Sequence, residues 1–199
     1  MRKEAEQFIK KSLKSWEFCK SKVLICASPK NSINNGLTFS YLDLDIYVRI
    51  IIFYKGSEFF VSCVVNEGML KQWNIDCAEL FDAAMENSIK QYSIETLSEL
   101  LGIQSPVEQV VVRLGDEMHG AGAIVFTDTI LNDVANFFDS DVIIIPSSIH
   151  EILCMSANDI DLNSASQLVR EVNEETVEGR DRLSDHAYLY HRKSKVITW

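Results

Sequence analysis

The chain has 199 residues, of which 47% are hydrophobic and 24% are charged, and its formal net charge at pH 7 is −10. A chain of this size and composition is expected to fold as one globular domain with a sizeable core, which excludes an intrinsically disordered protein. The longest apolar runs fall far short of the roughly 20 residues that span a bilayer, so no membrane partner is expected.

The charge is unevenly distributed along the chain. Residues 1–30 contain eight Lys or Arg and three Asp or Glu, a net +5, whereas residues 115–186 contain three Arg and fifteen Asp or Glu, a net −12. An acidic surface argues against direct nucleic-acid binding, because phosphate contacts need cations. The basic start could be a small electrostatic handle, but a solvated helix face is the simpler interpretation.

The cysteines indicate a reducing compartment. There are five, an odd number, and none stands in a Cys-x-x-Cys spacing. Cys63 and Cys154 lie within apolar runs and are expected to be buried thiols. The charged N-terminus is not followed by the apolar segment that a secretory signal contains. We therefore expect a cytoplasmic protein with reduced cysteines.

Apolar spacing predicts the elements of the first part of the chain. They are an amphipathic helix, a short strand, a loop and the two strands of a hairpin: residues 4–19, 23–27, 29–36, 46–54 and 59–66. Asn34-Asn35-Gly36 in the loop can supply positive-φ positions. The strand at 46–54 is apolar except for Arg49, which is typical of a strand buried on both faces. Lys55-Gly56-Ser57 predicts the tight turn of the hairpin.

Capping and turn residues divide the rest of the chain. Asp76 and Thr127-Asp128 are expected to cap two helices. Ser93 is expected to open a shorter helix that Gly102 stops. The helices expected here cover residues 77–91, 93–101, the segment from 127–128 to 138, and 162–177. The strands expected here cover residues 109–113, 121–126, 142–145, 187–190 and 196–199.

The strands occur in adjacent pairs, and helices stand between the pairs. This order predicts an α+β fold, a mainly antiparallel sheet of hairpins with helices packed on it, in a single compact domain. Within that domain we expect an N-terminal helix and loop-rich segment, residues 1–45, followed by an α+β core, residues 46–199.

The segment Pro146-Ser147-Ser148-Ile149-His150-Glu151 places polar side chains between two apolar runs, residues 142–145 and 152–155. Ser148 and Glu151 have the spacing of a capping box, which would start a helix. The apolar residues that follow lack helical periodicity, so a strand–turn–strand is favoured. In that geometry four candidate catalytic residues gather near one sheet edge: Ser147, Ser148, His150 and Glu151.

Two interpretations of this segment stay open. In an active site, His150 would be a general base or a metal ligand with a serine nearby. In a structural turn, the hydroxyls and the imidazole would satisfy backbone groups instead. Because buried polar groups are usually satisfied in this way, the structural interpretation is favoured.

Three further residues are candidates for binding: His119, Asn173 and Asp185. Asn173 stands among apolar residues of the helix expected near 162–177, so we expect it to face inward and to hydrogen-bond the turn at 146–151. Asp185 follows Leu183-Ser184 just before the last hairpin, where turn and capping residues are common.

No metal and no cofactor is expected. His186 and His191 are five residues apart in a strand region, which places them on opposite faces, and no His-Glu-x-x-His occurs. The glycine-rich segment 115–122 lacks the Lys-Ser/Thr of a phosphate-binding loop and contains two acids, so a hairpin turn is the favoured interpretation.

A set of short segments forms a recognisable pattern over roughly residues 46–199. They are Val64-Val65-Asn66 with Trp73, Glu79-Leu80, residues 84–88, residues 120–123, residues 145–151, Val172-Asn173, and Leu183-Ser184-Asp185 with Tyr188 and Tyr190. Together they resemble a family of domains of unknown function that is widespread in gut Firmicutes, often in clostridial relatives and their mobile elements. The Pro-Ser-Ser-x-His-Glu signature is the most specific piece. Ser88 and His119 depart from the pattern, which tends to carry threonine and asparagine there. The resemblance implies the same fold and brings no activity.

Two functions from different classes follow. The first is a non-catalytic cytoplasmic interaction or regulatory module with a protein partner that has a basic surface, for example an acidic, phage- or mobile-element-encoded inhibitor of a nucleic-acid-binding protein. The alternative is a hydrolase in which His150 is the base, Ser147 or Ser148 the nucleophile, and Glu151 or Asp185 the orienting acid.

Overall fold

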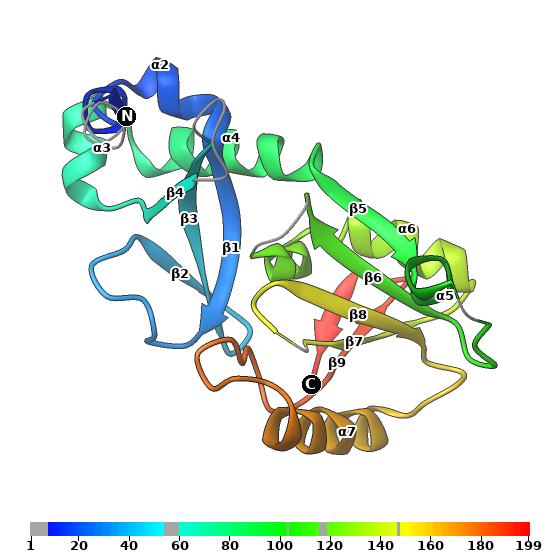
Figure 1. Ribbon diagram of the computed structural model, residues 1–199. Helices are drawn as coiled ribbons and strands as arrows, with labels where there is room; N and C mark the ends of the chain where they lie inside the picture. The colour runs from blue at the N-terminus through cyan, green and yellow to red at the C-terminus, as the bar shows by residue number, and fades with distance from the viewer. Residues whose placement is uncertain (1–7, 54–59, 103, 116–118, 147) are drawn as a thin grey trace.

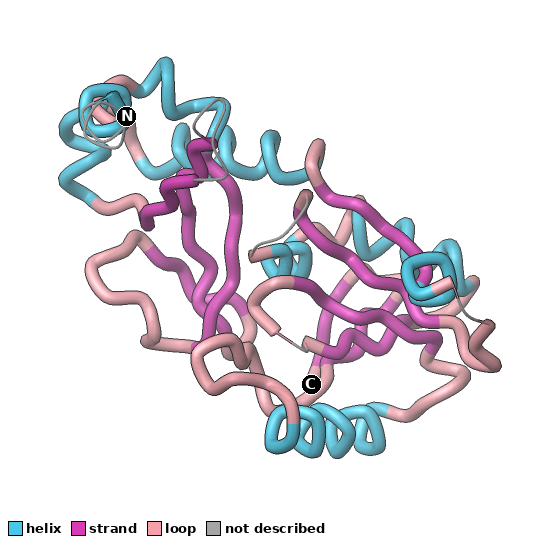
Figure 2. Tube along the Cα trace, viewed as in Figure 1, coloured by secondary structure: helices cyan, strands magenta, loops and turns pink. Residues whose placement is uncertain are grey.

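Two antiparallel sheets form the centre of the protein (Figures 1 and 2). The computed structural model describes residues 8–53, 60–102, 104–115, 119–146 and 148–199. The first sheet contains β1 (Val23–Pro29), β2 (Thr38–Tyr41), β3 (Leu44–Phe53) and β4 (Phe60–Val64). The second sheet contains β5 (Tyr92–Thr96), β6 (Gln109–Leu114), β7 (Val142–Ile145), β8 (Glu151–Ser156), β9 (Tyr188–His191) and β10 (Val196–Thr198).

Helices flank both sheets. They are α2 (Trp16–Cys19), η1 (Lys20–Lys22), α3 (Glu67–Trp73), α4 (Cys77–Ile89), α5 (Leu97–Leu101), η2 (Gly120–Val125), α6 (Ile130–Phe138) and α7 (Leu162–Glu175), and residues 8–12 are also helical. In Figure 1, α4 crosses the upper part of the first sheet and leads into β5 of the second, while α7 lies below the second sheet.

β3 organises the first sheet. It pairs with β1 along one side, and with β2 and then β4 along the other. Its residues Ile46, Val48 and Ile50 are fully buried in a core that also contains Leu80 of α4. On the opposite face Tyr47 is 2% exposed. The strand is therefore buried on both faces, as its continuous apolar sequence predicts.

The second sheet has helices on both faces. Its strands lie in the order β10-β9-β7-β8-β6-β5. Successive side chains of a strand point to opposite faces, and all four residues of β7 are buried. Val142 and Ile144 join the main core, which contains α6 residues, whereas Ile143 and Ile145 pack with Val169 of α7.

The short helix η2 lies between the two sheets, where we expected a strand at 121–126. That prediction is wrong, because the residues form a 3₁₀ helix. The side chains of the Gly-Ala-Gly-Ala run are so small that neighbouring backbone can approach the helix closely. A Cβ atom on Gly122 would lie 2.6 Å from the carbonyl oxygen of Ile25 in β1, so only glycine permits this approach.

Two helix predictions are partly wrong. Residues 93–96 belong to β5, and the helix starts only at 97, because Thr96 and Glu99 form a capping box there. The helix expected over 4–19 is interrupted: residues 8–12 are helical, and α2 begins anew after Ser15, whose Oγ accepts a hydrogen bond from the Phe18 N–H. Residues 4–7 lie outside the described residues.

The other boundary signals are mostly confirmed. Asp76 caps α4, and the loop before β2 has positive φ at Asn31 and Asn35. Gly102 ends α5 with φ of 63°. The caps expected at 127–128 are displaced, since Thr129 is the N-cap of α6. The sequence did not predict β2 and α3, and the turn at 55–57 lies outside the described residues.

The fold is α+β, with antiparallel sheets and packed helices in one compact domain, as predicted. The boundary expected between residues 45 and 46 falls within β3, and one core cluster contains Ile25 and Ile46 from its two sides. Among the described residues, no helix has the length and hydropathy that a membrane-spanning segment needs.

The approach of η2 to β1 can be tested with Gly122→Ala. The new methyl group would press on β1 backbone, which cannot yield like a flexible side chain, so a loss of roughly 1–3 kcal/mol in the free energy of unfolding is expected. Gly179→Ala is the matched control, because a Cβ atom there meets nothing within 4 Å. Urea denaturation measures both variants, and equal stabilities would contradict the close approach.

Candidate functional site

The turn between β7 and β8 contains the polar segment that the sequence singled out. The two strands pair antiparallel, which confirms strand–turn–strand over the capping-box helix. Ser147 lies outside the described residues. Ser148 is 8% exposed, and its Oγ accepts a hydrogen bond from the His150 N–H at 3.0 Å and donates one to Glu151 Oε1 at 3.0 Å. The Ser148 hydroxyl is thus used within the turn itself.

The ring of His150 lies between the backbone of His119 and the carboxylate of Asp181. Its Nδ1 accepts a long hydrogen bond from the His119 N–H at 3.5 Å, and its Nε2 is 3.6 Å from Asp181 Oδ1. When Nδ1 accepts, a neutral ring carries its proton on Nε2, which then points to Asp181. The side chain is 31% exposed. The hydroxyl of Ser148 contacts the backbone of His150, and the ring is held by other residues.

Backbone hydrogen bonds connect the turn to two other segments. The Gly120 N–H donates to the His150 carbonyl at 2.7 Å, and the Ala121 N–H donates to the Ile149 carbonyl at 3.3 Å. The Ile149 N–H donates to the Asp181 carbonyl at 2.9 Å. A Cβ atom on Gly120 would collide with the His150 carbonyl oxygen, so glycine is needed there as well.

His119 is a buried neutral histidine beside this turn. It is 7% exposed, has φ of 66°, and its ring centroid is 5.6 Å from that of His150. Burial lowers the pKa of His119 from its ordinary 6.5 to about 4, helped by the charges of Arg49 and His150 and opposed by Asp181. No hydrogen-bond partner of its Nδ1 occurs in the part of the chain that the structure describes.

The first sheet also contributes to the polar surroundings. Arg49 of β3 donates to Ser62 and to the Tyr47 hydroxyl, the latter at 3.5 Å. Burial raises the pKa of the nearby Cys26 thiol to about 12, so this cysteine is not a ready nucleophile. Sequence reasoning missed Asp181 and Arg49. No motif signals them, since Asp181 reaches the turn, and the charge of Arg49 reaches His119, from distant parts of the chain.

Asn173 faces inward, as expected, and is 1% exposed. The partners predicted for it are wrong, however. Its Nδ2 donates to the Ser184 carbonyl and to Asp185 Oδ1, both at 2.9 Å, instead of to the turn at 146–151. Asn173 therefore joins α7 to the segment before β9, and Asp185 accepts a hydrogen bond from its side-chain amide.

The remaining histidines have separate partners. His186 Nε2 is 3.0 Å from Asp43 Oδ2, and the Tyr188 hydroxyl donates to Asp43 Oδ1 at 2.7 Å, which ties β9 to the β2–β3 turn. His191 Nδ1 is 3.4 Å from Asp141 Oδ2. Across the described ranges, no three His, Cys, Asp or Glu side chains gather in a way that could hold a metal ion.

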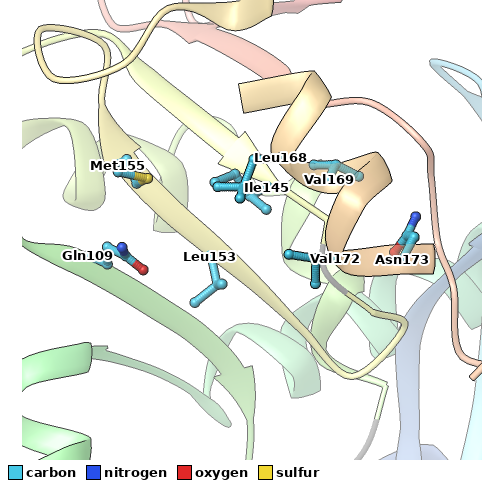
Figure 3. A pocket seen from close by; sticks show the side chains of 8 residues that line it. All are labelled: Gln109, Ile145, Leu153, Met155, Leu168, Val169, Val172 and Asn173. Carbon is cyan, nitrogen blue, oxygen red and sulfur yellow. The ribbon is translucent and has the colours of Figure 1, made fainter. Parts of the chain in front are cut away.

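A groove lies on the other face of the second sheet, between α7 and β8. Figure 3 shows aliphatic side chains from the helix and the strands around it. Its volume is about 70 Å³, and its apolar lining includes Ile145, Leu153, Met155, Leu168, Val169 and Val172. The sequence did not predict this groove, because α7 meets the sheet only in the folded chain.

The family of unknown function DUF5688 matches residues 2–192, and the chain belongs to this family. No curated protein and no solved structure matches the chain. The match confirms the expectation of a family of unknown function, and it assigns no activity to the chain.

The burial of neutral His119 predicts a pH dependence of stability. The folded-state pKa lies below the unfolded one, so the unfolded chain takes up the proton first as pH falls. The free energy of unfolding should therefore decrease from about pH 6.5 to about pH 4, by roughly 3 kcal/mol in total.

The matched variant is His119→Asn, because asparagine tolerates the left-handed backbone and does not titrate. Urea denaturation of both proteins between about pH 7 and about pH 4 isolates the effect, since all other groups are shared. Wild-type stability should fall relative to that of the variant, and parallel curves would contradict a neutral buried His119.

Proposed function

We propose that this protein is a non-catalytic interaction module that acts in the cytoplasm and binds a protein partner with a basic surface. The proposal is carried by exposed carboxylates on α7 beside the open apolar groove. Apolar area in such a place supplies affinity, while carboxylates select a cationic partner. Nucleic-acid-binding proteins have basic surfaces of this kind.

The helix α7 carries more acids than cations, with three glutamates against Arg170. Glu171, Glu174 and Glu175 are exposed, and none of them forms an ion pair within the described part of the chain. Arg180 pairs instead with Glu178 and Asp181. Uncompensated surface carboxylates produce a negative field that attracts a basic partner and speeds its association.

The turn at 146–151 supports a non-catalytic role. Ser148 bonds to the turn backbone and to Glu151, while the His150 ring contacts the His119 N–H at 3.5 Å and lies 3.6 Å from Asp181. A serine nucleophile needs a hydrogen bond to its base, and here the Ser148 hydroxyl donates its hydrogen bond to the Glu151 carboxylate instead.

A hydrolase that uses Ser147 or Ser148 with His150 and Glu151 is the second candidate. One observation favours it: His119 is neutral at pH 7 and its ring lies beside that of His150. Paired imidazoles near a serine are suited to proton transfer. In this candidate, Ser148 would have to leave Glu151 during turnover.

Salt dependence tests the proposed class of partner. Tagged protein is used to isolate partners from the native host, and each partner is identified and purified. Binding should then be measured from about 0.05 M to about 0.5 M NaCl, where screening shortens the range of charge interactions. We expect a partner with a basic surface whose affinity falls steeply with salt, and salt-independent binding would contradict the proposal.

His150→Ala separates the two candidate functions. If the ring serves the turn, its loss should lower the free energy of unfolding by roughly 1–3 kcal/mol and leave partner binding intact in the folded fraction. Stability is measured by urea denaturation, and ester hydrolysis by a panel of chromogenic esters. A wild-type esterase activity that vanishes in a fully stable variant would support the hydrolase instead.

A further inference from the structure

We propose that the groove between α7 and β8 is the anchor pocket for an amphipathic basic helix of the partner, with one aliphatic side chain in the groove and Lys or Arg beside it. This inference rests on the proposed function and names the surface and the chemistry that the partner needs. It uses neither the turn at 146–151 nor the histidines.

The groove exists because α7 covers only part of the second sheet. Ala165 and Val169 of the helix pack over β7, where Ile143 and Ile145 are buried. Beyond them β8 presents Leu153, which is only partly buried, and Met155. Figure 3 shows the space between this strand and the helix.

Leu168 marks the open side of the groove. It lines the groove and is 39% exposed, so part of its side chain is accessible to an occupant. A volume of about 70 Å³ suits the end of one aliphatic side chain. A pocket of this kind fits a single buried anchor surrounded by a polar rim, as at the centre of many interfaces.

The charged residues beside the groove determine which charge an occupant should carry. Residues three and seven positions after Leu168 lie on the same helix face, and these are the exposed Glu171 and Glu175. These acids along one side of an apolar slot complement a helix that has an aliphatic stripe edged with cations.

The test uses a synthetic probe peptide of Leu and Lys. Its spacing places the leucines on one face of an amphipathic helix and the lysines on the other. Titration into ¹⁵N-labelled protein should move the amide signals of Leu153, Met155, Leu168 and Val172. Two control peptides replace either the leucines with serine or the lysines with glutamate, and both should bind at least about tenfold more weakly.

Three protein variants locate the site. Leu168→Asp places a charge at the mouth of the groove and should lower the affinity for the probe peptide at least about tenfold. The double variant Glu171→Lys with Glu175→Lys should have an effect of similar size. Glu174→Lys makes the same charge change on the face of α7 away from Leu168, and should alter the affinity by less than about twofold.

The outcomes separate this inference from the proposed function. If the basic probe binds with salt sensitivity but ignores Leu168→Asp, the groove assignment fails and the acidic interaction module stands. If no basic probe binds at any site, both fail. A concentration-dependent dimer that Leu168→Asp abolishes would show that a second copy occupies the groove, which overturns the proposed partner.

Discussion

The close backbone approach of η2 to its neighbours is the constraint on which the two-sheet arrangement depends. Gly122 lies against the Ile25 carbonyl in the first sheet, and Gly120 donates its N–H to the His150 carbonyl at the start of β8 in the second. Both contacts require residues without a Cβ atom. The six residues of η2 therefore connect the sheets at van der Waals distance, and β1 and β8 are placed relative to each other by this short helix.

This constraint also explains the polar turn. The turn at 146–151 is held from one side by Gly120 and Ala121, and from the other by the Asp181 carbonyl. Its hydroxyl, imidazole and carboxylate groups are placed to satisfy one another and nearby backbone, which removes the cost of burying them unpaired. The same residues that suggest a catalytic site in the sequence thus connect three distant segments, and the open surface lies elsewhere, along α7.

Local signals predicted most of the elements and few of the contacts. Val142–Ile145, the β9–β10 hairpin and the capped helix after Asp161 follow from apolar runs and capping residues, which act within a few residues. The segment 121–126 was misjudged because alternating Gly and Ala is compatible with a strand by spacing, whereas its compact 3₁₀ form is chosen by the two backbones on either side. The Ser93 prediction failed for a similar reason, since pairing with β6 outweighed the capping tendency until Thr96.

The sequence by itself determined the fold class, the acidic character of residues 115–186, and the inward orientation of Asn173, because composition and periodicity decide these locally. Only the tertiary structure decided that Asn173 bonds Ser184 and Asp185, that Asp181 faces His150, and that Leu168 stands beside Leu153 at a groove. These contacts join residues that are far apart in the chain, and their partners are selected by how helices and sheets pack, which no local pattern records.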